Sequence, residues 1–485
     1  MRVVVLGAGI AGLGSALALS RAGHEVTLVE RDDIGRAVDA EDAFAARGRR
    51  GAPQTRHSHA FLARTRALLE REAPDVLSAL YAAGVSELRF TDSLPPEMEG
   101  FVPEPADEEL VALASRRTTF EWVLRDRAVA GGTVELVHDV AAGLESDQPG
   151  RGGGPSRAGT GPAIPRVTGV RLTSGRRLRA DAVVDATGRR SPLVSWVDDV
   201  GSLPPEVVSA DTGIVYSTRF YRLAEDAERP PADGPIGGDL GYMKYAVFPA
   251  DNRTFSITFA VPTSDADLRV LLHEGPFDRA ADAMPGTAAW VEPGRSSPIT
   301  GVEVMARLVN RKVDLVVRGS PVVTGFFAVG DSQVCTNPLY GRGCSLALVH
   351  AYLLSGVLAE HDPAGAEAAV AFHEATQAEL FPWYVAAVAQ DAESTPASGS
   401  GGGGGGGDGV AGMGNLVRDG LLPAARRDPR VLRAFLRVLN LLDAPTAPMS
   451  DPYVLGKVLE AFQERDSRPP LVMGPRRGEL LTTIV

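Results

Sequence analysis

The chain has 485 residues, of which 44% are hydrophobic, and this is enough to bury the cores of two or three domains. Its net charge of −12 leaves no basic face for phosphate backbones, which argues against a nucleic-acid-binding protein. The two cysteines cannot form a disulfide scaffold and fit a reducing cytoplasm, and no uninterrupted apolar run approaches the length of a membrane span.

The N-terminus has the pattern of a dinucleotide-binding strand, turn and helix. An apolar run over residues 3–6 predicts a buried parallel strand, and it is followed in Gly-x-Gly-x-x-Gly order by Gly7, Gly9 and Gly12. The first glycine permits a tight turn, the second lets the backbone approach a pyrophosphate, and the third lets the next helix pack on the strand. That helix, expected over residues 10–22, would offer its free N–H groups to phosphates.

A second strand, expected over residues 25–29, ends at Glu30, where the ribose of a dinucleotide needs a hydrogen-bond acceptor. Strand, turn, helix and acid together favour a dinucleotide site. Two simpler interpretations stay open. The glycine turn would only pack in one of them, and in the other the apolar N-terminus would be a secretion signal, which leaves the glycines and Glu30 as coincidences.

Residues 36–56 are rich in Ala, Gly and Arg, which predicts a mobile loop over this site. A helix is predicted from Gln54 to about residue 72. At its start Arg56, His57 and His59 would meet a cofactor or substrate, or would simply bond to the backbone. The two histidines do not predict a metal site, because a spacing of two turns them apart on a helix and no third ligand lies nearby.

Several short strands are predicted next, over residues 111–114, 134–140, 167–172, 177–179 and 181–188. Arg116 and Arg117 follow the first of them, where they would hold phosphate or ribityl oxygens or remain an ordinary solvated pair. Residues 148–165 contain many Gly and Pro and predict a hairpin excursion without a core. Ser191 and Pro192 predict the cap and first turn of a short helix.

The pattern of apolar and polar residues changes between residues 206 and 315. Alternating apolar and polar residues over 212–223, 242–248 and 254–261 predict a largely antiparallel sheet, followed by short helices near 265–290. Such an inserted sheet would form one wall of a substrate cleft against the dinucleotide domain.

The chain then returns to the first domain. A strand over residues 326–329 is followed by Gly330 and Asp331, which would accept hydrogen bonds from sugar-like hydroxyls. Beyond Asn337 and Pro338, Gly341 and Gly343 would let the backbone approach a flat ring, whose negative charge the next helix N-terminus would stabilise. Without a ligand the segment would be a plain turn and helix cap. Cys344, which opens the helix to about residue 360, is either a reactive thiol of lowered pKa or a small packing residue.

Residues 361–391 predict a long helix that Pro382 would break, and the Gly-rich residues 394–414 predict a flexible linker. Apolar spacing between Val431 and Leu442 predicts a further helix. That helix would cap the substrate cleft or, with the arginines between residues 426 and 437, dock on a membrane surface.

Taken in order, these motifs resemble those of the FAD-dependent group A flavoprotein monooxygenase superfamily, which has a para-hydroxybenzoate hydroxylase-like fold. The resemblance spans roughly residues 1–375 and is carried by residues 7–12, by Arg117 with Phe120 and Leu124, by residues 185–188, and by Gly330, Asp331, Pro338, Gly341 and Gly343.

We therefore expect an α/β fold with a Rossmann-like three-layer FAD-binding domain over residues 1–200, with minor excursions near 75–110. An antiparallel-sheet substrate domain would be inserted over 201–318. The FAD-binding domain would resume over 319–375, and a helical C-terminal region would occupy 376–485.

The resemblance implies that FAD is the cofactor, with Glu30 on the adenosine ribose, Arg117 on the phosphate or ribityl region, and Asp331 on a ribityl hydroxyl. It also implies that residues 338–344 line the isoalloxazine. No metal is expected, and the polar candidates near the ring are Arg56 and His57. The expected cofactor-binding residues are Gly7, Gly9, Ile10, Ala11, Gly12, Glu30, Arg31, Arg117, Val140, Gly330, Asp331, Pro338, Gly341, Gly343 and Cys344.

The implied activity is that of a cytoplasmic monooxygenase of secondary metabolism. It would insert one oxygen atom of O2 into a small organic substrate, by hydroxylation or epoxidation, via a C4a-hydroperoxyflavin. The alternatives are an FAD-dependent reductase or dehydrogenase of an isoprenoid or other lipid-like substrate, and a flavin-binding module without turnover.

Two departures, one from the aromatic hydroxylases and one from the halogenases, narrow the resemblance. Thr187-Gly188 stands where those enzymes carry Asp-Gly, which is more similar to the epoxidase, geranylgeranyl reductase and halogenase branches. The electron donor is therefore either NAD(P)H itself or a partner flavin reductase. The halogenase signature Trp-x-Trp-x-Ile-Pro is absent, and Trp196 has no such partner.

Overall fold

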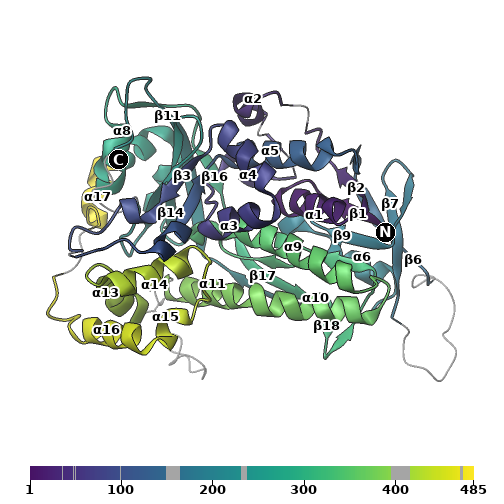
Figure 1. Cartoon of the computed structure of the whole chain (residues 1–485). Helices are drawn as coiled ribbons and strands as arrows, with labels where there is room; N and C mark the ends of the chain where they lie inside the picture. Colours follow the sequence, from purple (N-terminus) through teal and green to yellow (C-terminus); the bar gives the residue numbers. More distant parts are fainter. Residues whose placement is uncertain are drawn as a thin grey trace.

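A five-stranded parallel sheet forms the centre of the first domain (Figure 1), in the strand order β20-β9-β1-β2-β5. The computed structural model describes residues 1–34, 37–46, 48–49, 51–98, 100–148, 164–230, 237–394, 416–469 and 473–485. Val3 and Val5 face one core cluster and Val4 faces another, because successive side chains of a strand point to opposite faces. The strands are β1 (Arg2–Leu6), β2 (Glu25–Glu30), β5 (Val134–His138), β9 (Ala182–Asp185) and β20 (Phe326–Ala328).

Helices cover one face of this sheet and an antiparallel meander covers the other, which makes three layers. On the first face α1 packs against both α5 and α9. On the second face Trp196 of α6 packs with the meander β6-β7-β8. The predicted α/β fold with a Rossmann-like three-layer domain is confirmed. The covering elements are α1 (Ile10–Arg21), α5 (Arg117–Ala130), α6 (Leu193–Asp199), α9 (Gly343–Glu360), β6 (Ala141–Ser146), β7 (Val167–Leu172) and β8 (Arg177–Arg179).

The inserted segment forms an antiparallel sheet in the order β12-β13-β14-β11-β15, with β16 also paired to β11. Its central strands coincide with the alternating stretches of the sequence. One face is covered by the short helices that the sequence predicts there, and Phe259 stacks edge-on against Phe277. The elements are β11 (Ile214–Leu223), β12 (Gly237–Asp239), β13 (Lys244–Pro249), β14 (Thr254–Pro262), η5 (Asp267–Leu272), α7 (Glu274–Ala283), α8 (Pro285–Val291), β15 (Ser296–Pro298) and β16 (Glu303–Met305).

A three-stranded sheet in the order β10-β17-β21 joins the inserted segment to the returning chain. The helix predicted over 361–391 is broken as expected, but the break falls at Leu380, two residues before Pro382. Pro382 occupies the first turn of the second helix, where a missing N–H is harmless. These elements are β10 (Glu206–Asp211), β17 (Val309–Asp314), β21 (Val334–Cys335), α10 (Ala366–Glu379) and α11 (Phe381–Ser394).

Helix α9 is long and apolar enough to cross a membrane, with a mean hydropathy of 1.4. However, 56% of it is buried inside the protein, where it packs against α1 and α10. This is the position of a core helix.

The C-terminal helices cover two separate parts of the molecule (Figure 1). The group α13 to α16 packs on residues 90–110, and α17 packs on α7 of the inserted domain. The apolar face of α14 is buried against Leu110 and Val458, so the membrane-docking alternative is wrong for this helix. The elements are a π-helix η8 (Val417–Leu421), α13 (Leu422–Ala425), α14 (Pro429–Leu439), α15 (Ala447–Ser450), α16 (Pro452–Gln463) and α17 (Arg477–Ile484).

The structure corrects the prediction for residues 36–72. The helix predicted from Gln54 is only one 3-10 turn there, and a separate helix starts at Ala63. Residues 57–62 between them are irregular, because the histidines and Ser58 bond to other segments and to the backbone. The loop over 36–56 contains a helix, α2. The elements of this region are α2 (Ala40–Ala45), η1 (Pro53–Arg56), α3 (Ala63–Glu72), α4 (Pro74–Ala82), β3 (Ser86–Arg89), η2 (Phe90–Asp92), η3 (Pro105–Glu109) and β4 (Val111–Ala114).

Two predicted excursions lie mainly outside the described residues, namely most of 148–165 and of 394–414. The strand predicted over 134–140 ends at His138, which leaves Val140 between β5 and β6. The remaining short elements are η4 (Gly188–Arg190), β18 (Val316–Val317), β19 (Ser320–Pro321), η6 (Gly330–Ser332) and η7 (Pro338–Tyr340).

Candidate cofactor site

The first glycine turn is packed too tightly for side chains at two of its three glycines. A Cβ on Gly12 would lie 1.8 Å from the carbonyl oxygen of Gly7, and Gly7 itself has a φ of +96°. Gly9 differs, since the nearest atom to its Cβ position is an Arg117 guanidinium nitrogen at 3.7 Å. The turn therefore combines close helix–strand packing with one open position that faces a cation.

Glu30 is buried and lies where the sequence predicts it, at the end of β2. Its carboxylate accepts hydrogen bonds from the backbone N–H of Ala8 at 2.6 Å and of Asp32 at 2.9 Å. Arg49, which sequence reasoning missed, forms a 2.7 Å ion pair with the same carboxylate. The only signal for Arg49 is its place in the Arg-rich loop, which does not single it out among neighbouring arginines.

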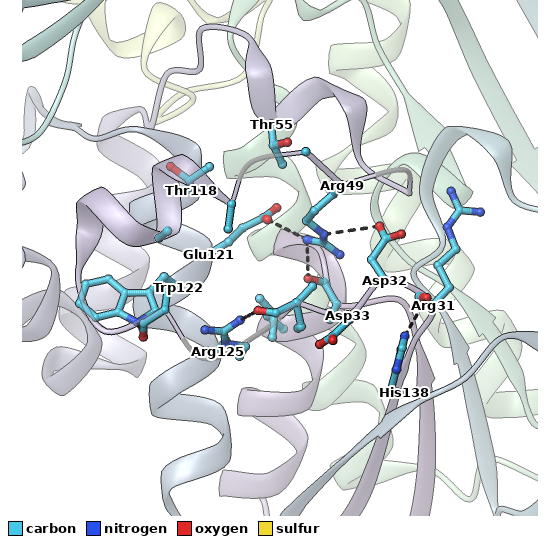
Figure 2. Close-up of a pocket in the computed structure, with 17 residues that line it drawn as sticks. Arg31, Asp32, Asp33, Arg49, Thr55, Thr118, Glu121, Trp122, Arg125 and His138 are labelled. Atoms are coloured by element: carbon cyan, nitrogen blue, oxygen red, sulfur yellow. Dashed lines mark hydrogen bonds and ion pairs between the residues drawn. The ribbon is translucent and has the colours of Figure 1, made fainter. Parts of the chain in front are cut away.

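Arg49 is the centre of a buried charge network (Figure 2). Its guanidinium lies 2.9 Å from Glu121 of α5 and donates to the carbonyl oxygen of Ala8 at 3.1 Å. Asp32 adds a more distant contact at 3.8 Å. Two buried carboxylates from different elements thus share one cation beside the glycine turn.

A cavity of about 410 Å3 opens beside this network. Figure 2 shows Arg49, Glu121 and Trp122 around it. Of the predicted cofactor-binding residues, Arg31 lines the cavity, whereas Val140 is exposed and is not part of the lining.

Arg117 lies against the glycine turn, with its side chain 10% exposed. Its guanidinium pairs with Glu121 at 2.7 Å and donates to Nε2 of His59 at 3.2 Å. Nδ1 of His59 bonds to the carbonyl oxygen of His57 at 2.9 Å, so this nitrogen carries the proton. Burial, with the nearby Arg117 charge, holds the pKa of His59 well below its usual value and keeps the ring neutral.

The return turn touches the first glycine turn. Gly330 has a φ of +59°, and its Cβ position lies 2.8 Å from Cβ of Ala11. Its N–H donates to Nδ1 of His350 at 3.1 Å, while Asp331 lies 3.9 Å from Arg189. The two glycine motifs, far apart in the sequence, are therefore neighbours in space.

Asp185 connects these turns from β9. Its buried carboxylate accepts hydrogen bonds from the N–H and hydroxyl of Thr187, at 2.9 and 2.6 Å, and from the hydroxyl of Ser191. Ser332 of the return turn adds a contact at 3.3 Å. Burial raises the pKa of Asp185, and these donors oppose that shift. Ser191 also accepts from the N–H of Leu193 at 3.0 Å. The N-cap of α6 is nevertheless Pro192, so the predicted cap and first turn are each displaced by one residue.

The segment from Pro338 packs on the irregular residues 57–62, which include His57 and His59. Gly341 has a φ of +65°, and its Cβ position lies 2.9 Å from Cβ of Ala60. Cys344 is buried at the start of α9, and burial raises the pKa of its thiol to about 12. Of the two interpretations, packing therefore holds and a lowered thiol pKa is wrong.

Arg56 and His57 lie between this segment and the inserted sheet. Arg56 is exposed and lies 3.5 Å from Glu303, whereas His57 is buried with Nδ1 3.1 Å from the hydroxyl of Thr218. Burial, with the charges of Arg189 and Arg56, lowers the pKa of His57 to about 4. His57 and His59 are not on a helix, so the spacing argument against a metal fails. Within the described residues no group of three or more His, Cys, Asp or Glu could hold a metal ion.

The residues of the site fit an elongated dinucleotide. The glycine turn approaches without side chains at the N-terminus of α1, and an acid ends the second strand. In the part of the chain that the structure describes, Nε of Arg49 and Nε of Arg189 are buried without a hydrogen-bond partner. Such donors at the two turns suit an anionic ligand.

Comparison with known proteins agrees with this geometry. Residues 2–145 match the family described as FAD dependent oxidoreductase. Protein Rv3254 of Mycobacterium tuberculosis is 25% identical over 96% of this chain and 96% of its own length. The D-amino acid dehydrogenase of Cereibacter sphaeroides is 54% identical, but over only 48 residues, 10% of each chain.

Solved structures of flavoenzymes share the fold. The flavin-dependent brominase Bmp2 superimposes with a TM-score of 0.57 at 14% identity, covering 97% of this chain and 100% of that one. PqsL of Pseudomonas aeruginosa, a probable FAD-dependent monooxygenase, gives 0.55 at 18% identity, covering 81% and 95%. The class defined by the fold and the site is that of the flavoprotein oxidoreductases. This chain is an FAD-dependent oxidoreductase that shares its fold with these solved flavoenzymes.

Proposed function

We propose that this enzyme is a monooxygenase that transfers one oxygen atom of O2 to a small organic substrate, as a hydroxyl or an epoxide. The observation that supports it is the contact between Gly330 and Ala11, which joins two distant glycine turns at one edge of the parallel sheet. Ligands of open α/β sheets bind outside the carboxyl ends of the strands. The inserted sheet meets the same edge through His57 and Thr218, where a substrate would lie against the cofactor.

The proposed binding mode assigns a part of FAD to each predicted residue. Glu30 would accept from the adenosine ribose, and the glycine turn with the N-terminus of α1 would face the pyrophosphate. Arg117 would hold the phosphate or ribityl region and Asp331 a ribityl hydroxyl. Residues 338–344 would line the ring.

Bound FAD would supply the electrons and the activation of O2. The chain itself orients the partners, excludes water and places charge. Because the pKa of His57 is about 4, its ring is neutral at physiological pH and exchanges hydrogen bonds without carrying charge. Arg189 lies beside it and would stabilise negative charge that develops at the ring.

The electron donor would be NAD(P)H or a partner flavin reductase. Thr187 has no carboxylate, and the nearby carboxylate of Asp185 already accepts from the N–H and the hydroxyl of Thr187. The segment therefore offers no free carboxylate to a nicotinamide. This arrangement favours the reductase partner. The enzyme would act in the cytoplasm, where its two free, buried cysteines stay reduced.

Rapid mixing tests the proposal. The purified holoenzyme is reduced with dithionite and mixed with oxygenated buffer, and absorbance is followed across the flavin bands. A monooxygenase is expected to show a transient species that is neither reduced nor oxidised flavin. Direct return to the oxidised spectrum, together with NADPH consumption without O2 uptake and a saturated product, would instead establish the reductase.

A further inference from the structure

A buried polar network joins helix α11 to the segment that follows Cys335. Its centre is Asp391 near the end of α11, which is 4% exposed. One carboxylate oxygen accepts from the side-chain amide of Asn310 at 2.7 Å. The other accepts from the side-chain amide of Asn337 at 2.7 Å and from the hydroxyl of Tyr340 at 3.2 Å.

These partners come from different parts of the fold. Asn310 belongs to β17, and Tyr340 closes the 3-10 turn η7 that Asn337 caps. The ring of bonds closes on itself, because the N–H of Asn337 donates to the side-chain oxygen of Asn310 at 2.7 Å. The side-chain oxygen of Asn337 accepts from the hydroxyl of Tyr216 in the inserted sheet, at 2.6 Å. Three regions of the chain therefore converge on Asn337, two of them on its side chain and β17 on its backbone N–H.

The chemistry of the network requires a carboxylate at position 391. Asn310, Asn337 and Tyr340 each donate to Asp391, so an ionised carboxylate satisfies them while an amide would turn an NH2 group against one of them. Burial raises the pKa of Asp391 and the amide donors oppose this effect. A buried charge without such donors would be strongly unfavourable.

We propose that Asp391 is a positioning residue that holds residues 337–341 in the conformation that receives the isoalloxazine. The inference rests on the proposed placement of the ring beside residues 338–344. It adds that the C-terminal region, which lies outside the nucleotide-binding motifs, governs cofactor binding. Through Asn337 and Tyr216 the same network links that segment to the substrate sheet.

The test compares Asp391→Asn with a matched control, Lys312→Met. Lys312 also connects β17 to α11, with its ammonium 4.2 Å from the centre of the Phe381 ring and 2.6 Å from Asp314, and neither of these contacts involves residues 337–341. For both full-length variants the melting temperature, the FAD dissociation constant and the visible spectrum of bound flavin are measured. A purely structural role lowers the melting temperature alone.

Asp391→Asn is expected to raise the FAD dissociation constant at least 10-fold and to shift the flavin absorption bands. Lys312→Met is expected to leave both within 2-fold of the wild type at a similar loss of melting temperature. Asn310→Ala removes one bond to Asp391 and the acceptor of the Asn337 N–H. It is expected to give an intermediate effect and decides the question if Asp391→Asn does not fold.

Equal FAD binding and identical spectra in the wild type, Asp391→Asn and Asn310→Ala would overturn the inference. Failure of the wild type to bind FAD would be a different result, since it would overturn the proposed binding mode itself.

Discussion

The N–H of Gly330 donates to Nδ1 of His350 at 3.1 Å, and this bond attaches the return turn to the core helix α9. On its other side the turn meets Ala11, whose Cβ lies 2.8 Å from the Cβ position of Gly330. The turn is thus held between two helices, and its backbone has a φ of +59° that side chains disfavour.

Gly330→Ala should therefore destabilise the protein for two reasons. The left-handed backbone conformation costs about 1–2 kcal/mol, and overpacking against Ala11 adds about 1–3 kcal/mol. The matched control is Gly319→Ala, because Gly319 has a φ of +76° with nothing within 4 Å of its Cβ position. Urea unfolding should show the larger loss, and weakened FAD binding, for Gly330→Ala only. Equal losses would mean that the contact with Ala11 yields freely.

Arg49→Met should be among the most damaging single changes at the site. It leaves the carboxylates of Glu30 and Glu121 buried without their shared cation, and breaking a buried pair in this way costs about 3–5 kcal/mol. Arg71→Met is the control, because the Arg71–Glu72 pair is exposed and pairs of that kind contribute about 0–1 kcal/mol. Chemical denaturation measures both. Glu121 keeps its ion pair with Arg117, so the rescue is made at Glu30. Adding Glu30→Gln to Arg49→Met should restore part of the loss, and no restoration would argue against the charge explanation.

Stability should fall in mild acid because two histidines are buried in the neutral form. Burial lowers the pKa of His350 to about 3, and burial with nearby arginines lowers that of His57 to about 4. The unfolded chain binds protons at these groups below about pH 6.5, whereas the folded chain does not. Their contribution is complete above that pH and decreases, as the pH falls toward the folded pKa, by about 1.4 kcal/mol per histidine and pH unit.

His350→Gln isolates this effect. Nδ1 of His350 accepts from Gly330, and Nε2 donates to Thr376, whose own hydroxyl donates to Phe372. Glutamine offers an acceptor and a donor but has no proton to gain in this range. The difference in unfolding free energy between pH 7 and pH 5 should be smaller in the variant by about 2 kcal/mol. An unchanged difference would show that His350 titrates normally.

Arg433→Ala should destabilise the C-terminal helices more than Arg430→Ala. Arg433 pairs with the buried Asp107 at 2.8 Å and stacks over Phe101, so its loss should cost about 2–3 kcal/mol. Arg430 is 61% exposed and pairs with Asp451, which is worth about 0–1 kcal/mol. Thermal unfolding compares the two. Sedimentation with anionic vesicles should show no binding of either variant or of the wild type, and binding that Arg430→Ala abolishes would revive the membrane-surface alternative.

The sequence predicts the nucleotide-binding half of this protein well because its signals are local. The run before Gly7 and the acid at Glu30 are close in the chain, and each reports directly on backbone geometry. The position of the inserted sheet was also predictable from alternating residues. The structure shows alternating burial in β13, whereas β11 and β14 are buried at almost every position.

Long-range partners were not predictable. Nothing local to Arg49 indicates that Glu30 and Glu121 share it, and nothing near Asp391 indicates Asn337. The helix predicted from Gln54 was wrong because His57 and Ser58 bond to the inserted sheet, and that tertiary contact outweighs local propensity. The membrane alternative for α14 failed for the same reason, as Arg433 and Arg437 of this helix pair with Asp107 and Glu109.

The order of strands in the central sheet determines when, during translation, this sheet can be completed. Strand β20 completes one margin of the sheet by pairing with β9, and it ends only at Ala328. Translation proceeds from the N-terminus, and domains usually fold as they emerge. Until β20 and the following helix α9 have left the ribosome, one edge of β9 has no partner strand. The return turn at Gly330 is then also missing from beside the first glycine turn. A nascent chain halted earlier would display a bare sheet margin, the kind of surface that invites aggregation.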